Sequence, residues 1–207
     1  MRHGLPCIAA ACLALILGGA AGVQAVASEP LRFSTVVIDA GHGGRDGGSA
    51  WNGLVEKNLC LDVAMRVETG LKARGLKTVM TRRTDTFVEL GQRARIANRS
   101  SSSIFVSIHF NGSRKTSIAG SEVYFRSPRG RGIATSISRS LQSGVSGSVR
   151  GAFYADYKVL RETEMPAVLV ECGYLSNKRE ARRCADPGHR QKLADAIIRG
   201  LLTARGK

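Results

Sequence analysis

Residues 36–49 of this chain read VVIDAGHGGRDGGS. An apolar run of β-type residues ends at Asp39, and a turn that contains five glycines then surrounds His42. Such a turn after a strand commonly binds phosphate, but a P-loop requires Gly-Lys-Ser/Thr and a dinucleotide fingerprint runs directly into a helix. Here the glycines are not followed by such a lysine, and the next amphipathic stretch begins only near Val55. The loop therefore favours a metal site over a nucleotide site.

Short β-branched runs alternate with amphipathic stretches along the rest of the chain, which is typical of βαβ units around a largely parallel sheet. Leu59, Val63 and Val67 recur every fourth residue and predict a helix that begins at Val55 and ends at Gly75. The length, 207 residues, suits one domain. We therefore predict the α/β class, with strands at 35–39, 76–81, 104–108, 121–126 and 167–170 and further helices at 89–98, 133–145 and 191–202.

Residues 1–27 have the pattern of a secretory signal peptide. A positive start at Arg2 precedes the apolar run CIAAACLALILGGAAG, and small residues follow at Ala25 and Ala27. An uncleaved membrane anchor is the alternative, but the apolar run is short for a membrane span. We expect residues 28–207 to form the catalytic domain of an exported protein of the periplasm or cell envelope.

The formal net charge is +15, which raises the question of an anionic partner. Nucleic acid is the first candidate for so basic a chain. The basic residues are dispersed, however, and lack the interleaved aromatic residues that single-strand binders use. We therefore expect no nucleic-acid partner. An anionic surface of the cell envelope is the better candidate, and a merely solvated basic face is the alternative.

Three cysteines, Cys60, Cys172 and Cys184, remain once residues 1–27 are set aside. They lack the C-x-x-C spacing of a thiolate zinc site, so we expect them to pack as small buried residues. His189 lies in a polar stretch and is expected at the surface.

Four side chains capable of chemistry fall at one edge of the predicted sheet. His42 follows the first strand, His109 ends the strand SIFVSIH, and Glu171 ends the strand AVLVE. Glu56 opens the helix that follows the glycine loop. Ligands of an open parallel sheet bind beyond the carboxyl ends of its strands, so we expect these four residues to converge. Two imidazoles and a carboxylate form a familiar catalytic zinc set, and a second carboxylate can act as general base.

Taken alone, each of these residues has an ordinary structural role as its alternative. A histidine after a strand is more often a turn or core residue than a ligand, and Glu56 is also a first-turn acid favoured by the helix dipole. For Glu171 the alternative is weaker, because an ionised carboxylate at the end of an apolar strand needs a partner. Asp39 either orients His42 from behind or binds backbone N–H groups at the strand end.

The chain resembles the zinc-dependent N-acetylmuramoyl-L-alanine amidases of the family that includes the bacterial cell-separation amidases. The resemblance follows the family's order and covers nearly all of residues 34–203. The segments that carry it are VVIDAGHGGRDGG, VEKNLCLDVA, TRRTDTFVELGQRARIAN, SIHFNGS, MPAVLVECGYLSN and ADPGHRQKLADAIIRGL.

The resemblance implies a reaction and a role for each candidate residue. His42, Glu56 and His109 match the zinc ligands, and Glu171 matches the catalytic glutamate. The implied substrate is peptidoglycan, cleaved at the amide between N-acetylmuramic acid and the L-alanine of the stem peptide. The implied fold is a twisted, mostly parallel sheet of about six strands with helices on both faces.

Two rival functions stay open at this point. Another exported zinc hydrolase of peptidoglycan, such as a peptidase or deacetylase, would use a similar metal set. A catalytically inactive, basic module that binds the cell envelope is the other rival, but such a binder would not need all four residues. About 60 residues separate His109 from Glu171, whereas cell-division members of the family carry an extra helical insertion that blocks the zinc. We therefore expect an open site that requires no activator protein.

Overall fold

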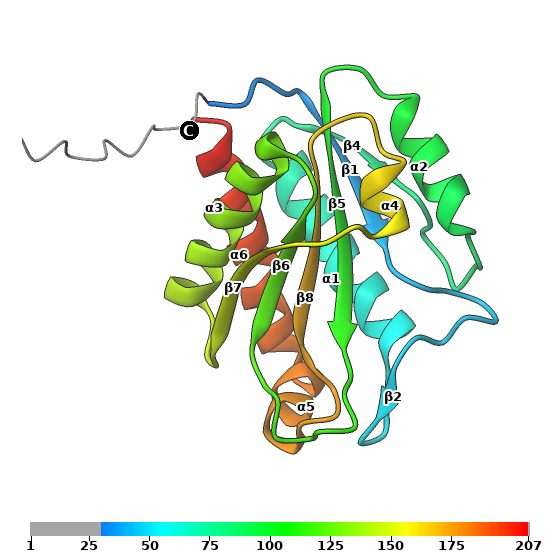
Figure 1. Cartoon of the computed structure of the whole chain (residues 1–207), viewed down its shortest axis with the longest axis vertical. Helices are drawn as coiled ribbons and strands as arrows, with labels where there is room; N and C mark the ends of the chain where they lie inside the picture. Colours follow the sequence, from blue (N-terminus) through cyan, green and yellow to red (C-terminus); the bar gives the residue numbers. More distant parts are fainter. Residues whose placement is uncertain (1–29, 207) are drawn as a thin grey trace, which may run out of the picture.

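The computed structural model describes residues 30–206. The predicted signal peptide lies outside these described residues. A six-stranded sheet runs through the centre of the fold in the order β4-β1-β5-β8-β6-β7 (Figure 1). Neighbouring strands are parallel except β6 and β8, which pair antiparallel. The strands are β1 (Thr35–Ala40), β4 (Lys77–Met80), β5 (Ser103–Asn111), β6 (Ser121–Phe125), β7 (Val149–Tyr154) and β8 (Ala167–Tyr174).

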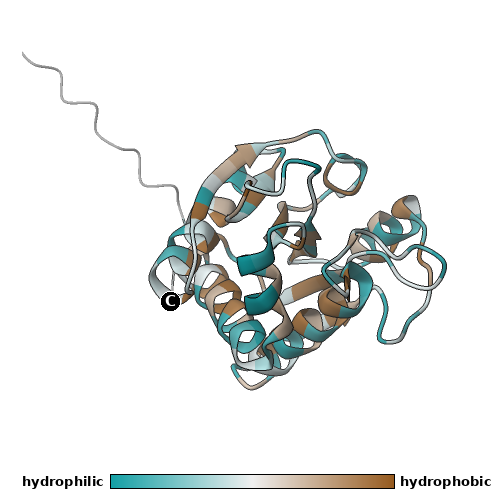
Figure 2. Cartoon of the chain, turned by 90° about the horizontal axis from the view of Figure 1, so that it is seen from below, coloured by the Kyte–Doolittle hydropathy of each residue, from teal (hydrophilic) through white to brown (hydrophobic). Residues whose placement is uncertain are grey.

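Helices cover both faces of this sheet. One face packs against α1 (Glu56–Lys72), α3 (Pro128–Gly144) and α6 (Pro187–Ala204), whose apolar residues form the larger core with the strands. The other face packs against α2 (Leu90–Asn98) and α4 (Lys158–Arg161), which build a smaller core. Hydrophobic and hydrophilic residues alternate along these helices, as expected for amphipathic elements (Figure 2). The predicted fold, one α/β domain with a mostly parallel sheet of about six strands and helices on both faces, is confirmed.

The site end of the molecule is formed where β1, β5 and β8 reach their carboxyl ends. These three strands are parallel and adjacent, so the residues that end them lie at one edge of the sheet. A short hairpin of β2 (Ala50–Trp51) and β3 (Leu54–Val55) connects the glycine loop to α1, and α5 (Lys178–Ala185) follows β8.

Most predicted elements lie where the sequence placed them, but four short ones were missed. The strand β7 falls in a stretch for which no strand was predicted, and the hairpin, α4 and α5 had no predicted counterpart either. In addition, β5 and β8 continue past His109 and Glu171 to Asn111 and Tyr174. Among residues 30–206, no helix is both long and apolar enough to cross a membrane.

Candidate metal centre

The structure brings together three of the four predicted site residues as a possible metal-binding group. One ligand atom each from His42, Glu56 and His109 lies within 4.8 Å of the others. Glu56 Oε1 is 3.0 Å from His42 Nε2 and 2.9 Å from His109 Nδ1. The two imidazole rings meet edge to face, with centroids 4.9 Å apart. Residues 53 positions apart in the chain thus meet because β1, β5 and the start of α1 share one edge.

The glycine loop allows the backbone to pass very close to these rings. A Cβ atom on Gly41 would lie 2.4 Å from the His109 ring, and one on Gly48 would lie 2.6 Å from Glu56 Oε2. Neither distance is compatible with a side chain, so both positions require glycine. His42 itself has a φ of 58°, a left-handed conformation that a non-glycine residue adopts only when its surroundings hold it.

The Glu56 carboxylate is buried and fixed by backbone donors. The N–H of Phe110 donates to Oε1 at 3.1 Å, and the N–H of Ser49 donates to Oε2 at 2.8 Å. Burial alone would raise the pKa of Glu56, but hydrogen bonds and charge from His109 and His42 hold it well below its usual range. Glu56 is therefore an ionised carboxylate between two imidazoles.

Asp46, and not Asp39, orients His42. Asp46 Oδ2 lies 2.8 Å from His42 Nδ1, which leaves Nε2 facing Glu56. Burial lowers the pKa of His42, yet the bonds to Glu56 and Asp46 outweigh it and raise the pKa. Asp39 instead accepts hydrogen bonds from Thr81, Ser107 and Arg93, so the suggestion that it orients His42 is wrong. Its carboxylate lies on the face of the sheet that α2 covers, where Arg93 binds it.

The donor set fits zinc. Ligands held tetrahedrally at about 2.0–2.1 Å from zinc lie about 3.3 Å from one another, which is close to the spacing of Glu56 Oε1 from the two imidazole nitrogens. The carboxylate behind His42 is the usual partner of a metal-binding imidazole. Two nitrogens and one oxygen also match the ligand types of catalytic zinc sites.

Glu171 lies beside this group, in register with His109 on the neighbouring strand. Its Oε2 atom is buried and has no hydrogen-bond partner among the described residues. Burial raises the pKa of Glu171 to about 7, with His109 opposing the rise and Glu56 and Glu122 adding to it. All four predicted residues line one open cleft of about 530 Å³, together with Tyr157, Leu90 and residues of the β5 end. A carboxyl group in this state can take up and release a proton near neutral pH.

Two buried arginines hold the glycine loop in place and were not predicted from the sequence. Arg93 donates to the carbonyl oxygens of Ala40 and His42 at 2.7 Å each, and Arg82 donates to those of Ala40 and Gly41. Both side chains are almost fully buried. They belong to the segment TRRTDTFVELGQRARIAN, which resembles the amidase family, so the only sequence signal for them was that resemblance.

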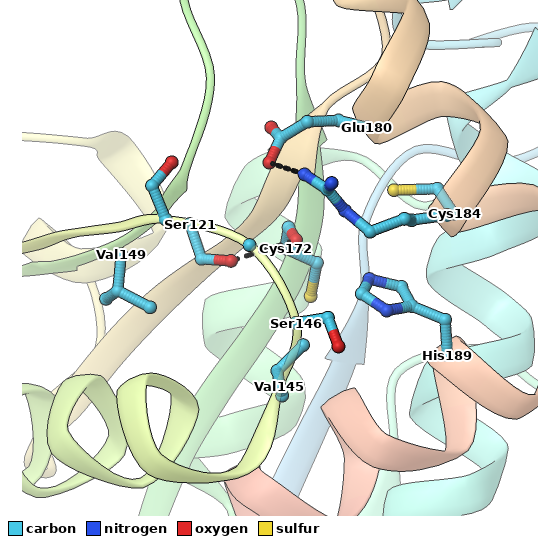
Figure 3. A pocket seen from close by; sticks show the side chains of 11 residues that line it. Ser121, Val145, Ser146, Val149, Cys172, Glu180, Cys184 and His189 are labelled. Atoms are coloured by element: carbon cyan, nitrogen blue, oxygen red, sulfur yellow. Dashed lines mark hydrogen bonds and ion pairs between the residues drawn. The ribbon is translucent and has the colours of Figure 1, made fainter.

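His189 and the cysteines lie away from this centre. The three cysteines are buried, as predicted, and the structure shows them free. The surface position predicted for His189 is wrong because the residue is 7% exposed. It lies near Cys172 and Cys184 at a pocket of about 10 Å³ on the opposite face of the sheet (Figure 3). That volume is about the smallest that holds one water molecule, and Glu180 beside it is paired with Arg183. The pocket is a packing defect and not a ligand site.

Comparison with known proteins points to one family. Residues 36–203 match the model of the family described as N-acetylmuramoyl-L-alanine amidase. The chain is 39% identical over 181 residues to the Bacillus subtilis protein YqiI, covering 86% of this chain and 87% of that protein. It is 34% identical over 179 residues to the Bacillus subtilis N-acetylmuramoyl-L-alanine amidase LytC, covering 84% of this chain but only 36% of LytC. The solved structure of the N-acetylmuramoyl-L-alanine amidase AmiC2 of Nostoc punctiforme superposes with a TM-score of 0.81 and 36% identity, covering 84% of this chain and 97% of that one.

Proposed function

The chain belongs to the N-acetylmuramoyl-L-alanine amidase family, and we propose that it is a zinc enzyme acting on peptidoglycan outside the cytoplasm, in the periplasm or cell envelope. The bond cleaved is the amide between the lactyl group of N-acetylmuramic acid and the L-alanine of the stem peptide. The observation that carries this proposal is the meeting of His42, Glu56 and His109 beside Glu171 in one open cleft.

His42, Glu56 and His109 would hold the metal. When bound, zinc would lower the pKa of a coordinated water to about 7 and would polarise the scissile carbonyl. The protein's part is to keep the ligands in the right state. Asp46 bonds to His42 Nδ1 and leaves Nε2 facing Glu56, and the N–H groups of Ser49 and Phe110 orient the Glu56 carboxylate.

Glu171 would move the proton. Its unpartnered Oε2 accepts a proton from the attacking water and then donates it to the alanine nitrogen as the amide breaks. Burial beside the cleft suits both steps, because a carboxyl group whose pKa is raised to about 7 is both a usable base and a usable acid near neutral pH.

The test is zinc content combined with mass spectrometry of digested peptidoglycan sacculi, with and without a chelator. We expect about one zinc per chain, and released stem peptides that begin with L-alanine only when the metal is present. Release of deacetylated sugars or of shortened peptides would instead identify a deacetylase or a peptidase. Binding of sacculi without any product would identify an inactive envelope-binding module.

Two variants separate the roles of metal and base. Glu171→Ala should keep zinc and lower hydrolysis by about 10²–10⁴-fold, the usual contribution of a general base. His42→Ala should lose both zinc and activity. Near-normal turnover of Glu171→Ala would contradict the role given to Glu171. Activity of the purified enzyme without any added protein would agree with an open site, and a strict requirement for a partner would exclude it.

A further inference from the structure

Three of the four tyrosines of the chain, Tyr124, Tyr157 and Tyr174, lie near the proposed active site. Aromatic residues make up only 5% of the sequence. Tyr124 lies on β6, Tyr154 on β7, Tyr157 directly before α4 and Tyr174 at the end of β8. Phe153 precedes Tyr154 on β7, which is the edge strand of the sheet.

The strand register places part of this group on the same face as Glu171. Glu171 is opposite Glu122 on β6, and Tyr124 is opposite Leu169 on β8 and Phe153 on β7. Residues opposite each other in a sheet point to the same side. Strands are about 4.8 Å apart, so β7 lies about 10 Å from the strand that bears Glu171.

We name Tyr124, Phe153 and Tyr157 the aromatic platform. The ring centroids of Phe153 and Tyr157 lie 6.1 and 5.2 Å from that of Tyr124. Phe153 is 39% exposed and Tyr157 is 41% exposed, although both are large aromatic residues. Tyr157 also lines the cleft that contains the candidate metal ligands, so the platform continues that cleft toward the edge of the sheet.

The rim of the platform is polar, and its charged side chains are paired with one another. Buried Glu122 accepts hydrogen bonds from the hydroxyl groups of Tyr124 and Tyr174 and from Asn111, and it forms an ion pair with Arg150. Nearby, Arg126 and Arg161 both pair with Asp156. These three arginines share two carboxylates, and each of them already donates a hydrogen bond to one of the two.

We propose that the aromatic platform binds the sugar rings of the peptidoglycan glycan strand. A pyranose ring has a face of C–H groups that an aromatic ring can cover, and its hydroxyl groups can bond to a polar rim such as that around Glu122. In the substrate of the proposed function, on which this inference rests, only the lactyl carbon and an ether oxygen separate the scissile carbonyl from the sugar. A sugar therefore has to lie next to Glu171, and the platform is an exposed aromatic surface that adjoins the cleft through Tyr157.

The test compares two neighbouring residues of β7 that face opposite ways. Phe153 contacts Tyr124 on the platform, whereas Tyr154 is more exposed, at 63%, but contacts Phe125 on the other face. Binding of peptide-free oligomers of N-acetylglucosamine and N-acetylmuramic acid is measured by calorimetry. We expect Phe153→Ala to weaken this binding about tenfold, and Tyr154→Ala to change it by less than about twofold.

A second measurement uses two substrates, a muramoyl peptide that carries the disaccharide and a lactoyl peptide that has no sugar. Phe153→Ala should raise KM for the first substrate and leave the rate on the second unchanged. Failure of the wild-type protein to bind the glycan oligomers, or equal effects of the two substitutions, overturns the inference. If the wild-type protein binds the oligomers but hydrolyses neither substrate, the proposed function fails while the platform stands.

Discussion

Glu171 differs from Glu56 in how its charge is compensated. Glu56 has two imidazoles and two backbone N–H groups around it, whereas Oε2 of Glu171 is buried without a partner among the described residues. As a consequence, the pKa of Glu56 is lowered while that of Glu171 is raised to about 7. Two carboxylates in one cleft thus differ in protonation, which suits one to bind metal and the other to transfer protons.

This difference predicts how the stability of the metal-free protein depends on pH. The native Glu171 carboxyl keeps its proton up to about pH 7, while the unfolded one loses it near 4.5. Between these values the unfolded state binds fewer protons than the native state, so the free energy of unfolding falls as pH rises. The loss attributable to Glu171 is about 3 kcal/mol by pH 8. Denaturant unfolding in chelator, at several pH values, measures it.

Glu171→Gln should remove most of that pH dependence, because an amide cannot ionise. The matched control is Glu164→Gln, which alters an exposed carboxylate on the chain segment just before β8 and should leave the slope as in the wild type. If wild type and Glu171→Gln lose stability in parallel from pH 4.5 to pH 8, then Glu171 is not the buried acid that the structure indicates.

For individual residues, the sequence predicted which ones lie at the ends of the strands. It did not predict which side chains form hydrogen bonds with them. We could place His42, His109 and Glu171 together because the ends of parallel strands lie at the same edge of the sheet, and this does not depend on side-chain rotamers. The partner of His42 could not be chosen in the same way. Asp39 and Asp46 flank it at similar distances in the chain, and only the left-handed turn at His42 brings Asp46 to its ring.

At the scale of elements, α2 acts as the support of the glycine loop. Arg93 on this helix bonds to the buried Asp39 carboxylate and to two carbonyl oxygens of the loop. Burial raises the pKa of Asp39, but Arg93, Ser107 and Thr81 outweigh it and lower the pKa. The loop that carries His42 is therefore fixed by a charge on an element that contributes no metal ligand.

Arg93→Met should consequently destabilise the protein by about 3–5 kcal/mol, because it leaves Asp39 as a buried charge without its partner. Arg95→Met on the same helix is the control, since Arg95 is exposed and should cost less than about 0.5 kcal/mol. Both are measured by chemical denaturation. Adding Asp39→Asn to Arg93→Met should recover part of the loss, and equal stabilities of the two single variants would contradict the role of Arg93.

Elements with strong periodicity were predictable, whereas short ones were not. The helices α1, α3 and α6 each bury a face of apolar residues along their length, so the regular spacing of these residues is visible in the sequence. The strand β7 is an edge strand with only partial burial and a bulge against β6, which breaks the alternation on which strand prediction depends. Likewise, α4 has a single turn and the β2–β3 hairpin has two residues per strand. Of these elements, α4 contributes Lys158 and Val159 to the lining of the cleft, so this wall of the cleft was not predicted from the sequence.

At the scale of the whole molecule, the positive charge is concentrated in part at the site end. Five exposed cations lie on α5 and on the adjacent loop between β5 and β6, namely Arg114, Lys115, Lys178, Arg179 and Arg182. A hydrogen bond from Asn177 to the carbonyl of Thr116 joins the loop to α5. Within residues 30–206 none of the five forms an ion pair with a carboxylate. They are free to attract an anionic polymer to the end of the molecule where the cleft opens.

This charge predicts that attachment to the cell wall depends on salt more than catalysis does. Raising NaCl from about 0.1 M to about 1 M shortens the screening length from about 10 Å to about 3 Å, which weakens attraction between exposed charges. Sedimentation with sacculi, using Glu171→Ala to prevent digestion, should show most of the protein bound at low salt and released at high salt. Hydrolysis of a small soluble muramoyl peptide by the wild type should change little over the same range, because it does not depend on attraction to the basic surface. A variant that replaces three of these cations should bind sacculi less tightly at low salt; it combines Lys178→Gln, Arg179→Gln and Arg182→Gln. Binding that survives about 1 M NaCl would mean that contacts with the glycan and peptide, and not the basic surface, hold the enzyme on the wall.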